Sequence, residues 1–182
     1  MTDRMKIAKR ALRRACRLRV FRRELEDYGI ELRPEMLELI EDSSNGGVNG
    51  KAAFSGHVRF SSDCNRVALE QTIVHELCHI VLWRVARARG LRGEESNTWR
   101  GHGQNFRGLL LASCAEYFRL SREDQQEIMA DWQLTKVMED VKHKELIAKG
   151  YRPGSKRISA YMLDDCIRRF VNERKNREEV VK

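Results

Sequence analysis

Residues 66–89, RVALEQTIVHELCHIVLWRVARAR, contain an H-E-x-x-H motif inside a long segment without Pro or Gly. Gly90 follows as a stop signal, so the segment is predicted to form one helix of roughly six turns. On that helix His75 and His79 lie about 40° apart, and both imidazoles project from one face. Two neutral imidazoles at this spacing form half of a tetrahedral zinc site. Glu76, about 100° round the helix from His75, is placed to take a proton from a water at the metal rather than to be a ligand.

A third ligand is expected from the segment GHGQNF at 101–106, which precedes another apolar helix. His102 stands at the start of that helix, after a loop long enough to turn the chain back towards the first helix. Three protein ligands leave a fourth position open for water, which is the arrangement of catalytic zinc sites. The sequence therefore predicts one catalytic Zn²⁺ ion held by His75, His79 and His102, with Glu76 as the catalytic base.

The two histidine motifs together resemble those of the SprT-like zinc metalloprotease domain, which is found in bacterial SprT proteins and eukaryotic Spartan. The residues concerned are HELCH at 75–79 and GHGQNF at 101–106, and FSGHVRFS at 54–61 is similar to the hairpin before the family's metal helix. The resemblance covers residues 5 to about 120. It implies a DNA-dependent metalloendopeptidase that cleaves DNA-bound or DNA-crosslinked proteins. The Cys-rich ribbon of many SprT-like proteins and the ubiquitin- and clamp-binding motifs of Spartan are not recognisable here.

The expected fold is α+β and mainly helical, since the 182 residues include only two prolines. A zincin-like metalloprotease core is expected over residues 1–120, followed by a C-terminal helical extension over 121–182. Residues 31–42 are predicted to form a short acidic helix, and Ser121 with Asp124 resembles a helix-capping box. The core is expected to contain a basic N-terminal helix 4–28, a hairpin 52–61 that turns at Ser55-Gly56, the metal helix 66–89 and the third-ligand helix 103–119.

Positive charge is concentrated at the N-terminus. Residues 1–23 hold ten Lys or Arg and one Asp, whereas the formal charge of the whole chain is +8. Such a run is either a solvated helix face or a surface for nucleic-acid phosphates. Trp99, in the loop that follows the metal helix, could stack on a nucleic-acid base, or it could simply cover the core. The candidate nucleic-acid-binding residues are Arg10, Arg13, Arg14, Arg17, Trp99 and Arg100.

The cysteines and the apolar runs indicate where the protein works. Five cysteines without a C-x-x-C pair argue against a disulfide framework or a zinc ribbon, and Cys78 is expected to be a small core residue. No apolar run approaches the roughly 18 residues of a membrane helix, and no signal peptide is recognisable. We expect a cytoplasmic protein, nucleoid-associated or nuclear according to its source, whose partners are a protein substrate and DNA, single-stranded DNA included, rather than a membrane.

Two alternative functions remain open from the residues. One is a general zinc peptidase without DNA dependence, including a processing protease of a virus or mobile element. The other is a non-catalytic nucleic-acid-binding module with a structural zinc, which Cys64 or Cys114 as fourth ligand would favour and Glu76 argues against. His57 is expected to be a surface residue. Carboxylates that could orient the ligand histidines are Glu70, Glu94, Glu95 and Glu116.

Overall fold

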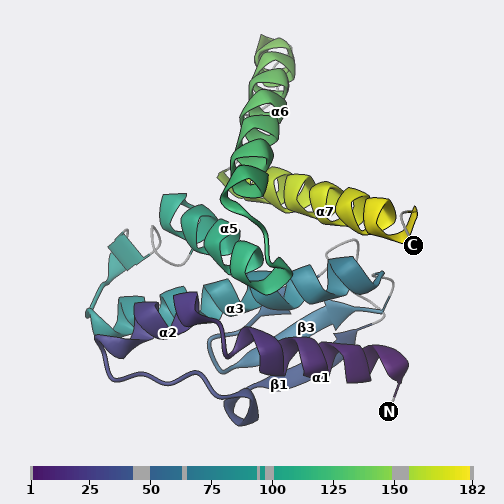
Figure 1. The fold of residues 1–182 in the computed structure, drawn as a ribbon. Coiled ribbons are helices and arrows are strands. Elements are labelled where there is room, and N and C mark those ends of the chain that lie inside the picture. The colour runs from purple at the N-terminus through teal and green to yellow at the C-terminus, as the bar shows by residue number, and fades with distance from the viewer. Residues whose placement is uncertain are drawn as a thin grey trace.

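The computed structural model describes residues 2–42, 50–62, 65–93, 95–96, 101–148 and 156–180. The fold is mainly helical with one small three-stranded sheet, so the expected α+β class is confirmed. Figure 1 shows the sheet below the long helix α3 (Arg66–Ala88), with helices α5 (Gln104–Phe118) and α7 (Lys156–Val180) above it. None of the described helices combines the length and the apolar character that crossing a bilayer requires.

Helix α3 is the centre of the molecule. Asn65 caps it by accepting a hydrogen bond from the N–H of Ala68 at 2.9 Å, and Gly90 follows its end with a φ of +66°. Every residue from Val67 to Leu82 is buried. A helix that is buried on all sides needs cover all round, and the sheet, two N-terminal helices, α5 and α7 all pack against it. The predicted metal helix 66–89 is therefore present and forms the core.

The sheet has the strand order β1-β3-β2, with β1 (Glu38–Asp42) parallel and β2 (Gly50–Ala52) antiparallel to β3 (His57–Ser61). The predicted hairpin 52–61 is confirmed, although β2 begins two residues earlier. The predicted helix over 31–42 is wrong: a 3-10 turn η1 (Pro34–Met36) leads into β1. A twelve-residue helix is marginal without packing, whereas β3 offers this segment a complete row of backbone partners.

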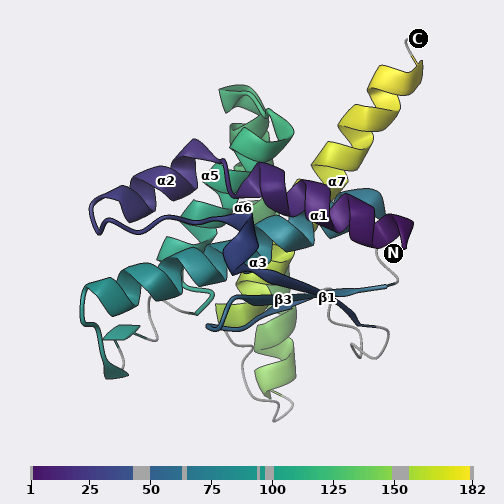
Figure 2. The same cartoon turned by 90° about the horizontal axis from the view of Figure 1, so that it is seen from below.

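The basic N-terminal segment forms two helices instead of the single helix predicted over 4–28. Helix α1 (Asp3–Ala15) and helix α2 (Arg19–Glu26) are separated by Leu18, whose ψ of 131° is extended. The Glu116 carboxylate of α5 accepts hydrogen bonds from the N–H groups of Arg19 at 2.8 Å and Val20 at 3.0 Å. The side chain of a distant residue thus caps α2, and the break lets both helices turn their apolar faces to α3 (Figure 2).

Helices α6 (Arg122–Ala148) and α7 follow α5, and Figure 1 shows α6 projecting from the body. The expected capping box is confirmed, because Asp124 N–H donates to Ser121 Oγ at 3.0 Å and Ser121 N–H donates to Asp124 Oδ2 at 2.7 Å. Leu163 and Ile167 of α7 are fully buried in the same hydrophobic core as α3. The segment assigned to a C-terminal extension thus contributes a helix to the wall around α3.

Candidate metal centre

Three histidines converge beside α3. Nε2 of His102 lies 3.1 Å from Nε2 of His79 and 3.3 Å from Nε2 of His75. Zinc–nitrogen bonds of about 2.0–2.1 Å in a tetrahedron place ligand nitrogens about 3.3–3.4 Å apart, so these two separations suit a metal ion. All three ligand atoms lie within 4.8 Å of one another. Among the described residues no other His, Cys, Asp or Glu joins this cluster.

Local sequence explains this convergence. His75 and His79 are one helical turn apart on α3, and His102 directly precedes Gly103, the N-cap residue of α5. Phe106, one turn into α5, is fully buried and forms the floor of the cluster. Its ring centroid lies 4.8, 4.3 and 4.8 Å from those of His75, His79 and His102. The H-G-x-x-F spacing therefore supplies both a ligand and the ring on which all three imidazoles pack.

Asp164 of α7 orients His75. Its Oδ2 lies 2.7 Å from His75 Nδ1, and Gln71 Nε2 donates to Asp164 Oδ1 at 3.0 Å and to the Asp164 carbonyl at 2.7 Å. Burial lowers the pKa of His75, but the charge and hydrogen bond of Asp164 outweigh it, so the pKa is raised overall. A proton on Nδ1, held by this carboxylate, makes Nε2 the ring nitrogen whose lone pair can bind a metal.

The orienting carboxylate of His75 was not among the residues predicted for this role. Glu70 pairs with Arg66 at 3.2 Å, Glu116 caps α2, Glu95 is exposed and Glu94 lies outside the described residues. The sequence carried one signal for Asp164: it precedes Ile167 by three positions and Val171 by seven, and so stands on the buried stripe of α7. An acidic residue on an apolar stripe requires a buried partner.

Glu76 lies in a tight space between α3 and β2. It is 5% exposed, and its carboxylate accepts a hydrogen bond from the backbone N–H of Ala52. Burial raises the pKa of Glu76 to about 7; the Asp164 charge adds to the rise, and His75 and Ala52 oppose it. Gly50 makes the space possible, because a Cβ atom there would lie 2.8 Å from Glu76 Oε1 and 2.4 Å from Thr72 Cγ2.

Comparison with protein-family models, with curated proteins and with solved structures finds no match for this chain. The metal centre itself is described by its geometry, in which His75, His79 and His102 meet as the spacing predicted.

The candidate nucleic-acid-binding residues are only partly available. Arg10, Arg13, Arg14 and Arg17 are exposed on or just after α1. Arg14 donates to the Tyr117 carbonyl, and its guanidinium lies 4.2 Å from the centroid of the Tyr117 ring, so it joins α1 to α5. Trp99 and Arg100 lie outside the described residues.

Three other expectations concern residues near the centre. Cys78 is fully buried and its Sγ lies 3.8 Å from Ser113 Oγ, which confirms it as a core residue. Cys114 is also fully buried and is not a member of the histidine cluster; Cys64 lies outside the described residues. His57 is half-exposed and pairs with Glu38 at 3.0 Å on the sheet, so it is a surface residue as expected.

Proposed function

We propose that this protein is a zinc-dependent metalloendopeptidase with a zincin-like core. The observation that carries the proposal is the convergence of three imidazole nitrogens at tetrahedral spacing, with a buried carboxylate on the residue after the first ligand. Structural zinc sites close with four protein ligands and do not require such a carboxylate. In the described part of the chain the cluster has three protein ligands, and this number together with Glu76 favours hydrolysis over a structural role.

Glu76 has the role of general base and general acid. A zinc ion bound by the histidines would polarise the scissile carbonyl and lower the pKa of water to about 7. Glu76 takes a proton from the attacking water and returns it to the leaving amine, which needs a carboxylate fixed within hydrogen-bond reach of both. The Ala52 N–H and the wall at Gly50 hold it in one place. Asp164 keeps His75 in the required tautomer.

A protein substrate would reach this centre along the sheet. β2 is an edge strand of the described sheet, and its residues Gly50 and Ala52 are those that contact Glu76. Extended peptides bind edge strands through backbone hydrogen bonds, which are independent of side-chain sequence. A peptide paired with β2 would therefore pass beside Glu76 in the conformation that peptidases require.

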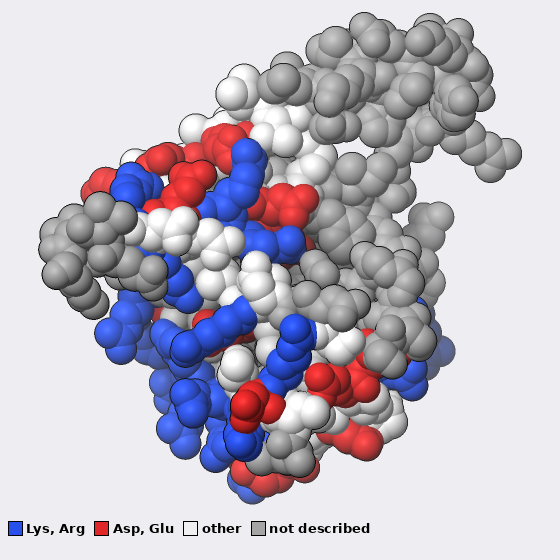
Figure 3. Space-filling view, turned by 90° about the vertical axis from the view of Figure 1, so that its right-hand side faces the viewer, with Lys and Arg blue, Asp and Glu red and all other residues white. Residues whose placement is uncertain are grey.

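We further propose that the substrates are DNA-bound or DNA-crosslinked proteins and that DNA increases cleavage. The exposed cations of α1 and α2 support this, and Figure 3 shows Lys and Arg side chains crowded on one flank of the molecule. Contacts with phosphates would bring the protease to proteins on DNA and would weaken with salt. The exposed basic residues of this N-terminal segment are Arg4, Lys6, Lys9, Arg10, Arg13, Arg14, Arg17, Arg19, Arg22 and Arg23.

Cleavage of a DNA-binding protein, measured with zinc and with or without single-stranded DNA, tests the proposal. The control is Glu76→Gln, which keeps the shape of the side chain but not its basicity. Cleavage by the wild-type protein but not by the Glu76→Gln variant, with equal zinc content in both proteins, supports the peptidase. Cleavage that is indifferent to DNA would leave a general zinc peptidase. Tight zinc binding without any cleavage would instead favour a non-catalytic module.

A further inference from the structure

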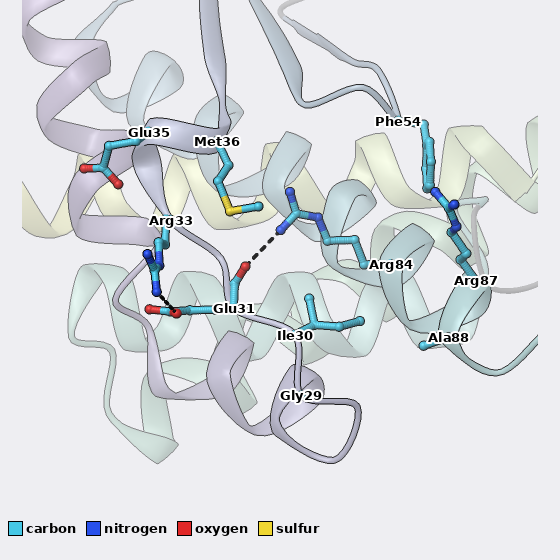
Figure 4. A pocket seen from close by; sticks show the side chains of 10 residues that line it. All are labelled: Gly29, Ile30, Glu31, Arg33, Glu35, Met36, Phe54, Arg84, Arg87 and Ala88. Atoms are coloured by element: carbon cyan, nitrogen blue, oxygen red, sulfur yellow. Dashed lines mark hydrogen bonds and ion pairs between the residues drawn. The ribbon is translucent and has the colours of Figure 1, made fainter.

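Two exposed apolar side chains share one cavity beside α3. Met36 and Phe54 are 54% and 50% exposed, and the only other large hydrophobic side chain that is exposed in the described part of the chain is Leu134. Both line a cavity of ≈1190 Å³ against the C-terminal half of α3 (Figure 4). Exposed apolar groups that gather in a concave surface indicate a binding site more strongly than the same groups scattered.

The backbone fixes the positions of Met36 and Phe54. Gly56, in the turn that follows Phe54, has a φ of +95°, and a Cβ atom there would lie 2.7 Å from the Met36 carbonyl oxygen. The carbonyl oxygen of Gly56 accepts a hydrogen bond from the N–H of Glu38 at 3.0 Å. The hairpin turn is thereby held against η1, so the apolar surface is preformed and binding a ligand there costs little ordering entropy.

Two arginines of α3 give the cavity a positive character. Arg84 Nη1 donates to the Glu31 carbonyl at 3.1 Å, and burial lowers the pKa of Arg84. The Arg87 guanidinium lies 5.4 Å from the centroid of the Phe54 ring. Neither arginine pairs with a carboxylate in the described part of the chain, because Arg33 holds the Glu31 carboxylate at 2.6 Å. Figure 4 shows the Glu35 carboxylate pointing away from Arg84.

Shared side chains connect the cavity to a second hollow, which Trp83 links to the metal centre. Phe54 and Arg87 also line a second hollow of ≈350 Å³, together with Trp83 and Leu91. The Trp83 ring stacks on His79 with centroids 5.8 Å apart, and lies 6.4 Å from Phe54. Trp83 and Arg87 follow His79 by one and two helical turns, which is about 6 and 12 Å along α3. An extended peptide covers about 12 Å with roughly four residues.

We propose that this cavity binds a segment of the protein substrate that combines an aromatic or long aliphatic side chain with neighbouring carboxylates, about four residues from the cleaved bond. The apolar side chain packs on Phe54 and Met36, and the carboxylates pair with Arg84 and Arg87. That this segment belongs to a substrate rests on the proposed peptidase function.

Direct binding tests this inference independently of cleavage. The full-length Glu76→Gln protein is titrated against a fluorescein-labelled peptide in which Phe is flanked by Asp residues in a Gly-Ser background. Arg87→Gln and Phe54→Ser, each added to Glu76→Gln, should weaken binding roughly tenfold, as should replacement of the Asp residues by Lys. Arg122→Gln is the matched control, since Arg122 is exposed on α6 and its substitution should leave affinity unchanged.

Several results would overturn the inference. One is equal affinity of all variants for the peptide. Another is a loss of labelled oligothymidylate binding in the Arg87→Gln protein while its peptide binding is unchanged. A third is self-association of the protein that Phe54→Ser abolishes. If Arg87→Gln weakens peptide binding but the wild-type protein cleaves no substrate, the docking cavity is supported and the peptidase function is rejected. If wild-type and Arg87→Gln proteins cleave the Asp-Phe peptide with the same KM, the peptidase function is supported and the docking cavity is rejected.

Discussion

Asp164 of α7 and His75 of α3 are joined by a 2.7 Å contact between Oδ2 and Nδ1, although the two helices are far apart in the sequence. Because His75 is also a candidate metal ligand, the docking of α7 and the binding of a metal are linked. Whatever strengthens one must strengthen the other, since the free energies belong to one thermodynamic cycle. Residues after position 155 thus bear directly on the metal centre.

Asp164→Asn should lower zinc affinity by about 10- to 100-fold, because the amide no longer fixes the Nδ1–H tautomer of His75 by charge. Competition with a chromophoric chelator measures the affinity. The matched control is Asp165→Asn, because Asp165 is exposed and contacts only Arg168 at 3.4 Å among the interactions described. Equal zinc affinity of the Asp164→Asn and wild-type proteins would show that His75 is oriented without α7.

Gly50→Ala should destabilise the protein by about 1–3 kcal/mol, because its Cβ would overlap Thr72 Cγ2 and crowd the Glu76 carboxylate. Denaturant unfolding measures the free energy of unfolding. Gly108→Ala is the control: it lies within α5 with nothing within 4 Å of the new Cβ, and should stabilise by about 0.5–1 kcal/mol. If both variants were equally stable, β2 would have room to move away from α3.

Glu116→Gln should destabilise α2 and do so only when Glu116 is ionised in the wild-type protein. Burial raises the pKa of Glu116, but the N–H donors of Arg19 and Val20 and the Arg19 guanidinium outweigh it, so the pKa is lowered. A lowered pKa in the folded state gives stability that is complete above the unfolded pKa of about 4.3 and is lost as pH falls through the folded value.

The difference in free energy of unfolding between wild-type and Glu116→Gln proteins should therefore be about 0.5–2 kcal/mol at pH 7 and should shrink below about pH 4. Urea unfolding at a series of pH values measures it. Glu123→Gln serves as the control, since Glu123 is an exposed residue in the first turn of α6. A difference that stayed constant down to pH 3 would mean that the carboxylate charge does not contribute to the cap.

Substitution of Arg10, Arg13 and Arg17 by Gln should reduce the dependence of single-stranded DNA binding on salt, by about 0.7 in the log–log slope for each phosphate that an arginine no longer neutralises. Arg14→Gln should instead lower thermal stability, because Arg14 contacts Tyr117 of α5. Fluorescence anisotropy at several salt concentrations measures the slope, and Arg122→Gln, which removes one exposed positive charge from α6, is the control. An unchanged slope in the triple variant would make α1 a solvated face.

Local patterns were sufficient to predict the elements that carry the ligands. The helix around His75 and His79, its end at Gly90 and the start of α5 after His102 each depend on residues within a few turns. The same locality explains the success with the turn at Gly56 and the capping box at Ser121. In these places propensity, periodicity and spacing all favour one structure.

The features that were missed depend on residues distant in sequence. The break between α1 and α2 is stabilised by Glu116, and β1 forms because β3 supplies its backbone partners. Asp164 reaches His75 only after α7 has packed against α3. Sequence periodicity contains no information about such pairings, and intrinsic propensity was overridden by tertiary contacts in each case.

Cover on all sides of α3 has a consequence for the protein before any ion binds. The backbone amides from Val67 to Leu82 are shielded, so their exchange with solvent deuterium should require unfolding of the whole molecule. His75 and His79 are therefore held at metal-binding distance by the hydrophobic core rather than by the ion. Chelation should leave the fold intact and the site ready to be filled again, in contrast to zinc fingers, which unfold when the metal is removed.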